Sequence, residues 1–447
     1  MNDEIKLSDH FGYRKLIKFT LPSIIMMLFA SVYGVVDGVF VSNFSGDGGV
    51  SFAAINLIMP FLMTLSAFGF MIGVGGSALV SKIMGEGDYK RANSIFSMLI
   101  YVSIGLGIIL TLIALLVLEP VSILFGAKDE TLEACLIYGR ILLPSLPFFL
   151  LQNAFQSFAV AAEKPKLGLA SMLASGITNI VLDALFIVAL GWGITGAAIA
   201  TMIAQIFGGA VPLIYFALKN SSPLRLGKPV FEGKALLKSL TNGSSEFLTN
   251  IALSFVNMLY NFQLMALVGN NSGVEAFGVI NYAGFIFISI ILGFAIGVSP
   301  IISFHYGAKN HEELKALYKK CMKIIILLSV VLFIAVLALG YPMSYLFVGS
   351  REEVFSLAIE GFFLYSFGFF FVGVNIFSSA FFTALNDGLT SAILSILRTL
   401  VLPAVCIFVL PLFLDITGVW LAFAVSEAIS IIASIIALVV NRNKFNY

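Results

Sequence analysis

The chain has 447 residues, of which 60% are hydrophobic and 11% are charged, and its formal net charge is +1. Soluble domains are about 45–50% apolar and about 25% charged, so this composition excludes a soluble enzyme, a disordered chain and a nucleic-acid binder with a basic surface. The apolar runs are continuous rather than alternating, which also excludes an outer-membrane barrel.

The apolar stretches, each about 20 residues long, have the length that crosses a bilayer as a helix. They predict an all-α polytopic membrane protein with twelve transmembrane helices. Glycine and polar turn signals such as Gly85-Glu86-Gly87-Asp88 separate them. In chain order the predicted helices are 16–42, 52–80, 95–118, 138–161, 169–190, 196–217, 243–269, 276–303, 322–340, 355–384, 389–411 and 417–440.

Positive charge is unevenly distributed along the chain. Of the 25 Lys and Arg residues, 21 lie on one side of the predicted bundle, together with both termini, whereas Lys128 and Arg351 lie on the other. Cytoplasmic loops carry an excess of Lys and Arg, so both termini are predicted to be cytoplasmic. We therefore expect a multi-pass protein of the cell membrane (the inner, cytoplasmic membrane).

The cysteines and tryptophans are placed by the same topology. Cys135 is expected on the outer side, Cys321 on the inner side and Cys406 within a helix, so no disulfide and no metal cluster are predicted. Trp192 and Trp420 are both expected near the outer interface, where Trp is enriched.

The two halves of the chain resemble each other. Residues 69–74 (GFMIGV) return as 293–298 (GFAIGV), and residues 194–196 (ITG) return as 416–418. Each half has an even number of predicted helices, so the repeats are parallel, an arrangement found in transporters. This predicts two pseudo-symmetric six-helix lobes, 1–222 and 243–447, joined by a basic cytoplasmic linker, 223–242.

Two acidic residues are expected inside the membrane, where a charge costs about 2.5–3.5 kcal/mol and therefore marks function. Asp37 and Asp183 lie at similar distances from the outer ends of their helices. Asn179 shares a helical face with Asp183, and Thr201 reaches the same level from the next helix. Oxygen ligands suit a hard cation, and neighbouring carboxylates favour a shared proton or a positive ion. We predict a cation-coupling site at these four residues, which would be the metal ligands if the ion is Na+.

The second half lacks this acid pair, because Asp37 corresponds to Asn261 and Asp183 to Val405. The ionic site is therefore predicted to belong to the first lobe. Glu246 could line the cavity or be a solvated helix start, and Glu427 is expected to pair with Arg398.

The candidates for substrate binding or gating are Pro22, Tyr33, Gln152, Asn153, Gln156, Glu246 and Asn261. Pro22 could kink the first helix by freeing a backbone carbonyl. Gln152, Asn153 and Gln156 could face substrate or satisfy neighbouring helices. The glycine pairs in the repeated GFxIGV segments favour close helix packing, with a small residue every fourth position.

Some chemistry is missing from the sequence. All three histidines, His10, His305 and His311, lie in or beside predicted cytoplasmic segments. There is no phosphate-binding Walker loop, no His/Cys set with metal-ligand spacing and no nucleophile elbow. These observations disfavour an intramembrane enzyme and ATP hydrolysis, and they predict no cofactor.

These residues resemble the multidrug and toxic compound extrusion (MATE) family, and its MepA-like branch in particular. The resemblance covers nearly the whole chain. It rests on Pro22, Tyr33 and Asp37 in the first helix, on the Asn179, Asp183 and Thr201 set, and on residues 297–309 (GVSPIISFHYGAK).

The resemblance implies a V-shaped bundle of two six-helix lobes that alternates between inward- and outward-facing states. It implies export of cationic or amphipathic organic compounds in exchange for Na+ or H+. It also assigns the coupling cation to Asp37, Asn179, Asp183 and Thr201, and it makes Glu246 similar to the helix-seven acid of another branch.

The predicted function is therefore a secondary active multidrug exporter that works as a monomer in the lipid bilayer and binds no nucleic acid. One alternative is a flippase for a lipid-linked glycan, which should present Arg or Lys to a pyrophosphate, yet few bases, Arg140 and Arg398, lie within helices. The other is a non-transporting membrane receptor or assembly protein, which predicts no substrate-dependent ion flux.

Overall fold

The computed structural model describes residues 5–44, 49–349 and 351–447. This part of the chain is almost entirely helical and contains no strand. Among the described residues, 11 helices are long and apolar enough to cross a membrane, and one bent pair brings the number to 12. The all-α polytopic prediction is confirmed.

The first lobe contains seven helices. A short 3-10 turn, Leu143–Ser145, joins α4 to α5 into one span, and a π-helical segment, Ala184–Ala189, extends α6. The helices are α1 Tyr13–Phe44, α2 Val50–Gly85, α3 Tyr89–Leu124, α4 Asp129–Leu142, α5 Leu146–Ala161, α6 Pro165–Asp183 and α7 Gly193–Ala217.

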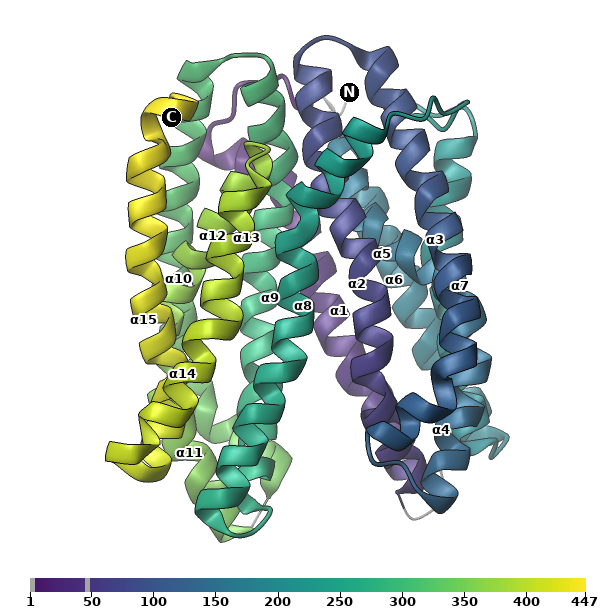
Figure 1. The fold of residues 1–447 in the computed structure, drawn as a ribbon, viewed down its shortest axis with the longest axis vertical. Coiled ribbons are helices and arrows are strands. Elements are labelled where there is room, and N and C mark those ends of the chain that lie inside the picture. Colours follow the sequence, from purple (N-terminus) through teal and green to yellow (C-terminus); the bar gives the residue numbers. More distant parts are fainter. Residues whose placement is uncertain (1–4, 45–48, 350) are drawn as a thin grey trace.

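The second lobe contains the remaining helices, and a π-helical segment, Leu397–Val401, joins α13 to α14. Their bounds are α8 Gly233–Val268, α9 Ser272–Gly307, α10 His311–Val348, α11 Glu352–Ser366, α12 Phe369–Ala384, α13 Gly388–Ile396, α14 Leu402–Val409 and α15 Pro411–Phe445. Figure 1 shows the two lobes side by side. Helices α1 and α2 of the first lobe face α8 and α9 of the second.

Several predicted helix limits are wrong. The predicted helix 243–269 begins ten residues earlier, at Gly233, and the predicted helix 322–340 begins at His311. Hydropathy detects only the part of a helix that the bilayer covers, whereas the backbone hydrogen bonds continue through polar turns beyond it. The predicted helix 355–384 is bent by 53° between α11 and α12. Within α15 the helix is interrupted at Asp415, where φ is 48°.

The lobes touch backbone to backbone at one end. A Cβ atom on Gly243 of α8 would overlap the carbonyl oxygen of Met71 on α2, and one on Gly75 would overlap the carbonyl oxygen of Ser239. Gly293 of α9 also packs closely on α1, where its Cβ would stand 2.5 Å from the Cα of Ile24. The close-packing prediction for the GFxIGV glycines is confirmed, since Gly69 faces α5 in the same way.

The first described residues bridge the lobes at this closed end. The backbone N–H of Leu7 donates to Glu163 Oε1 of the first lobe at 2.7 Å. The backbone N–H of Phe11 donates to Glu313 Oε1 of the second lobe at 2.9 Å, and His10 Nδ1 lies 2.6 Å from Glu313 Oε2. Leu7 and Phe11 are fully buried. This N-terminal segment therefore holds both lobes together.

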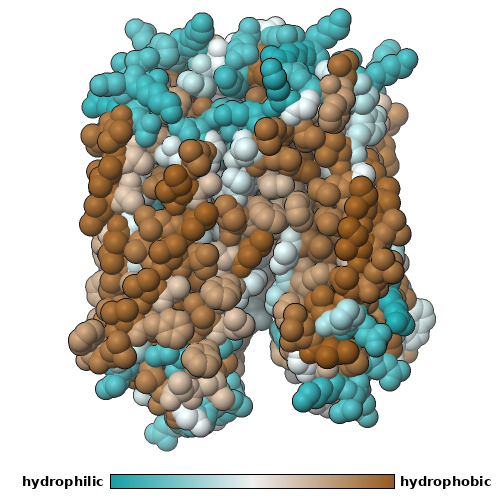
Figure 2. Space-filling model, in the orientation of Figure 1, coloured by the Kyte–Doolittle hydropathy of each residue, from teal (hydrophilic) through white to brown (hydrophobic). Residues whose placement is uncertain are grey.

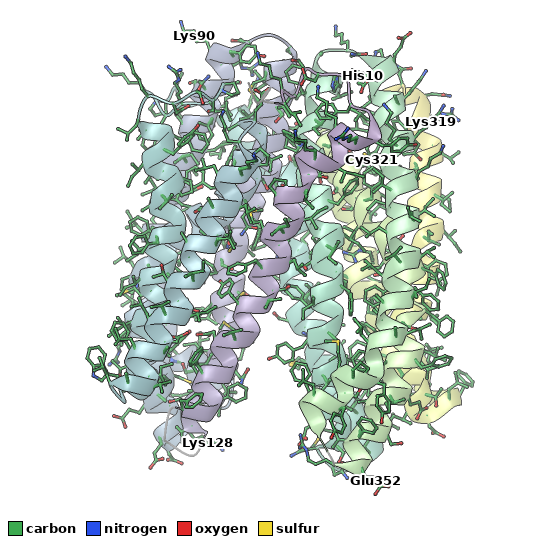
Figure 3. The ribbon with its side chains drawn as sticks, turned by 180° about the vertical axis from the view of Figure 1, so that it is seen from behind. His10, Lys90, Lys128, Lys319, Cys321 and Glu352 are labelled. Atoms are coloured by element: carbon green, nitrogen blue, oxygen red, sulfur yellow. The ribbon has the colours of Figure 1, made fainter. Side chains whose placement is uncertain are left out.

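At the opposite end the lobes diverge, and Figure 2 shows a notch between them there. A broad hydrophobic band crosses the face seen in Figure 2, and hydrophilic residues gather at the closed end. Lys90 and Lys319 lie at the closed end, whereas Lys128 and Glu352 lie at the tips of the two lobes at the open end (Figure 3). The side predicted from Lys and Arg to face the cytoplasm is thus the closed end.

The segment between the lobes lies against the first one. The backbone N–H of Arg225 donates to Asn93 Oδ1 at 2.6 Å, and that of Gly227 donates to Ser97 Oγ at 3.0 Å. Arg91 Nη2 and Nε donate to the two carboxylate oxygens of Glu232 at 2.5 and 3.2 Å. This guanidinium holds the pKa of Glu232 below its usual range.

The cysteines are free and buried. Trp192 is 47% exposed near the open end of α7, as an interfacial residue should be. Trp420 is fully buried, so it does not face lipid, and its depth at the outer interface stays a prediction. A Cβ on Gly361 would stand 3.1 Å from the Trp420 ring, so helix α11 packs against the indole and excludes lipid from it.

Candidate functional site

A cavity of about 120 Å³ lies inside the first lobe between α1, α2, α4, α5, α6 and α7. A glycine allows two of these helices to approach, because a Cβ on Gly176 of α6 would overlap the ring of Phe29 on α1. The cavity is lined by Tyr33, Gly34, Asp37, Met59, Leu62, Met63, Tyr138, Leu142, Leu143, Leu146, Phe149, Asn179, Thr201 and Gln205.

The structure brings the four predicted coupling residues together at this cavity. The Asp37 side chain of α1 interacts with Asp183 and Asn179 of α6. Asn179 Nδ2 lies 3.4 Å from Thr201 Oγ1 of α7. Asp183 is fully buried and Asn179 is 2% exposed. Two acids on different helices thus meet within the membrane-spanning part of one lobe.

The cluster is rich in acceptors that have no donor. Among the described residues, Asp37 Oδ1, Asn179 Oδ1 and both carboxylate oxygens of Asp183 are buried without a hydrogen-bond partner. A buried polar atom without a partner costs about 1–3 kcal/mol, and a buried charge costs more. Four orphan oxygens around two acids fit a cation or a shared proton, since either would neutralise the charge.

Tyr138 of α4 belongs to the same cluster and was not among the residues predicted from the sequence. Its ring is fully buried, and its hydroxyl lies among Asp37, Asp183 and Thr201. A tyrosine in an apolar helix gives no sequence signal beyond burial. Gln205 also lines the cavity and accepts a hydrogen bond from Ser145 Oγ at 2.7 Å. This residue was predictable from the sequence. It lies one turn after Thr201 and therefore on the same helical face.

We expect Tyr138→Phe to weaken ion binding by about three- to tenfold. The substitution keeps the ring and removes only the hydroxyl, and a typical hydrogen bond contributes about 0.5–1.5 kcal/mol to a binding site. The measurement is the ion concentration that half-saturates transport. Tyr365→Phe is the matched control, since Tyr365 is a buried tyrosine of the second lobe that is stacked on Phe423. An unchanged half-saturation in Tyr138→Phe would remove this residue from the site.

A second cavity, of about 300 Å³, connects this site to the space between the lobes. It shares Tyr33, Asp37 and Met59 with the first cavity and also includes Tyr282 and Phe285 of α9, which belongs to the other lobe. Both of these aromatic side chains are nearly half exposed. Asp37 therefore lies where the ionic site of the first lobe meets an aromatic cleft between the lobes.

The predicted amides of α5 lie elsewhere. Gln152 Nε2 donates to Ser175 Oγ at 3.2 Å, and Asn153 Nδ2 lies 3.4 Å from the carbonyl oxygen of Ser66. Gln156 Nε2 lies 3.4 Å from Asn153 Oδ1. All three side chains are buried, and none lines either of the cavities at Asp37. Gln152 and Asn153 contact neighbouring helices, Gln156 contacts Asn153 of its own helix, and a substrate role stays a prediction.

Two other candidates also lie apart from the acid pair. Pro22 is buried in α1 and lines a different cavity near the closed end, so its proposed gating role stays a prediction. Asn261 of α8 is exposed and lines neither of the cavities at Asp37.

The second lobe has an ionic network of its own. Arg398 Nη1 donates to Glu427 Oε1 at 3.2 Å, which confirms the predicted pair. Asn375 Nδ2 donates to Glu427 Oε2 at 2.6 Å, and Glu246 interacts with Arg398. The one embedded base of this network is therefore engaged by carboxylates. In the described part of the chain, no group of three or more His, Cys, Asp or Glu side chains could hold a metal ion.

Two helical lobes that meet at one end, with an acid pair beside the cleft between them, define the chain as a polytopic membrane transporter. A sequence model of the MatE family matches residues 22–185 and 246–409, one segment in each lobe. The chain belongs to the MatE family, a family of multidrug transporters rather than enzymes.

Relatives agree over nearly the full length. The chain is 28% identical to the multidrug export protein MepA of Staphylococcus aureus (strain MRSA252), over 97% of this chain and 94% of MepA. It is 26% identical to MepA of Staphylococcus saprophyticus over the same shares. A crystal structure of MATE in complex with MaL6 superposes with a TM-score of 0.92 and 23% identity, covering 100% of this chain and 99% of that one.

Proposed function

We propose that this protein exports small organic compounds, cationic or amphipathic, in exchange for Na+ or H+, by alternating access between its two lobes. The observation that carries the proposal is the interacting pair Asp37 and Asp183, whose buried carboxylate oxygens, like the amide oxygen of Asn179, have no donor. The S. aureus and S. saprophyticus relatives are named multidrug export proteins, which supports organic compounds as the substrates.

The coupling ion binds at Asp37, Asn179, Asp183 and Thr201. Carboxylate, amide and hydroxyl oxygens are the ligands that a hard cation prefers, and they would serve Na+. A proton would instead be held by one carboxyl of the pair, because two adjacent carboxylates repel each other. Either ion removes negative charge from the site.

The substrate occupies the cleft between the lobes. Tyr282, Phe285 and Met63 give its wall a flat, apolar character that suits aromatic compounds. Asp37 faces this wall and attracts an organic cation while it is ionised. When an ion binds at the acid pair, that attraction is lost and the substrate leaves through the open end.

Alternating access follows from the contacts between the lobes. The glycine contacts and the N-terminal segment close one end, whereas the other end is open (Figure 1). With the closed end at the cytoplasm, as the Lys and Arg distribution predicts, this arrangement is outward-facing. The predicted division into lobes 1–222 and 243–447, with the linker 223–242, gives the two bodies that would move.

The flippase alternative receives no support from the site. A pyrophosphate would need a free base in the membrane, yet Arg398 donates a hydrogen bond to Glu427 and also interacts with Glu246. The pair at the cleft is acidic and would repel a phosphate.

Transport in liposomes tests the proposal. Purified protein is reconstituted, and movement of a fluorescent organic cation is followed under an imposed Na+ gradient and then under a pH gradient. We expect one of the two gradients to drive accumulation and thereby to identify the coupling ion. Folded protein that moves no organic cation under either gradient would contradict ion-coupled export.

A further inference from the structure

A third cavity, of about 470 Å³, lies in the first lobe at the closed end, where the N-terminal segment passes the starts of α1 and α6. Neither of the cavities at Asp37 shares a lining residue with it. Three lysines of the wall, Lys18, Lys164 and Lys166, come from these two helix starts.

The charge of this cavity is positive. Glu163 is the one acid among its lining residues, and its Oε1 atom accepts the backbone N–H of Leu7 at 2.7 Å. Burial raises the pKa of Glu163, which makes its negative charge easier to neutralise. Lys18 and Lys166 are exposed, so their ammonium groups remain available at the mouth.

An apolar surface continues from the cavity along the membrane-spanning part of α1. Phe19, Leu167 and Tyr215 form the apolar part of the cavity wall. Leu21 and Ile25 follow Lys18 on the same face of α1, and they are 46% and 40% exposed. A ligand with a negatively charged end and a long apolar part would therefore fit this surface, with its charged end at the lysines and its apolar part along α1.

We propose that this cavity binds the headgroup phosphate of an anionic phospholipid from the leaflet at the closed end, with the acyl chains against α1. Basic pockets between membrane helices at the cytoplasmic side are the setting in which anionic lipid headgroups bind. The three lysines repel an organic cation, which separates this cavity from the transport pathway. A soluble phosphate would use the lysines but not the apolar surface.

Lipid binding is measured on the full purified chain by native mass spectrometry, with phosphatidylglycerol and phosphatidylcholine titrated separately. The test variant is Lys18→Gln with Lys166→Gln, since both side chains are exposed and neither change should disturb folding. The matched control is Lys90→Gln with Lys319→Gln. These two exposed lysines lie at the same closed end (Figure 3) but outside the cavity, so the control removes the same charge.

We expect the unaltered protein to prefer phosphatidylglycerol over phosphatidylcholine. The test variant should bind phosphatidylglycerol at least about tenfold more weakly, because each lysine near an anionic lipid contributes roughly a factor of five. The control should bind as the unaltered protein does. Thermal denaturation of both variants verifies that they are folded.

Three results would overturn the proposal. Equal binding of the two lipids would remove the charge requirement, and an equal loss in both variants would show diffuse attraction to the positive end. Displacement of phosphatidylglycerol by millimolar inorganic phosphate or glycerol phosphate would identify the cavity as a site for a soluble anion.

Discussion

Asp37→Asn and Asp183→Asn are each expected to reduce gradient-driven transport to the level of protein-free liposomes. Asparagine keeps the shape of the side chain but cannot ionise, so neither variant can exchange a proton or neutralise Na+ with a full charge. Because the two acids interact directly, removal of either one disables the pair. The measurement is the initial rate of organic-cation movement under the gradient that drives the unaltered protein.

Asp415→Asn is the matched control for these variants. Asp415 is exposed, and its φ of 48° is a conformation that asparagine adopts readily, so this change should leave transport intact. Undiminished transport in Asp37→Asn, with normal membrane insertion, would contradict ion coupling at this acid pair.

Gly243→Ala is expected to shift the protein away from the closed-end arrangement by about 5- to 150-fold in population. The new Cβ would overlap the backbone of Met71, which cannot rotate away, so the lobes must separate there. Overpacking of this kind costs about 1–3 kcal/mol, and the cost falls on the state in which the lobes touch. Transport should slow, because the cycle needs both states at comparable free energy.

The shift is measured as the distance between spin labels on Lys90→Cys and Lys319→Cys, which lie on different lobes at the closed end (Figure 3). The native cysteines are buried, which limits background labelling. Gly278→Ala is the matched control, since a Cβ there meets nothing within 4 Å. If Gly243→Ala fails to fold, Gly75→Ala tests the same contact between α2 and α8 from the α2 side. Identical distance distributions in the glycine variant and in Gly278→Ala would show that the contact between α2 and α8 does not determine which arrangement of the lobes is populated.

The acid pair was predictable from sequence because an ionisable residue in a membrane helix is an anomaly that needs a reason. Asn179 followed from helical spacing around Asp183, and Thr201 followed from its matching level in the next helix. Tyr138 was not predictable, since burial of an aromatic residue is the ordinary expectation in a chain with 43 Phe. The same abundance concealed Tyr282 and Phe285, which acquire meaning only when α9 is placed opposite α1.

The fold was predictable in class and in its two-lobe repeat, but the contacts between the lobes were not. Spacing showed that Gly293 favours close packing, yet it could not show that α1 of the other lobe is its partner. Burial of Trp420 was not predictable, because hydropathy locates a residue along the membrane normal and says nothing about which helix covers it. The helix starts at Gly233 and His311 were missed because polar turns outside the bilayer carry no hydropathy signal.

Ion movement driven by the organic substrate tests the exchange most directly. Liposomes that contain the protein are prepared without an ion gradient, an organic-cation gradient is imposed, and the internal Na+ or pH is recorded. The account predicts an ion flux opposite to the substrate, present only when substrate is present and absent in Asp37→Asn. Substrate that crosses the membrane with no accompanying flux of either ion would contradict it.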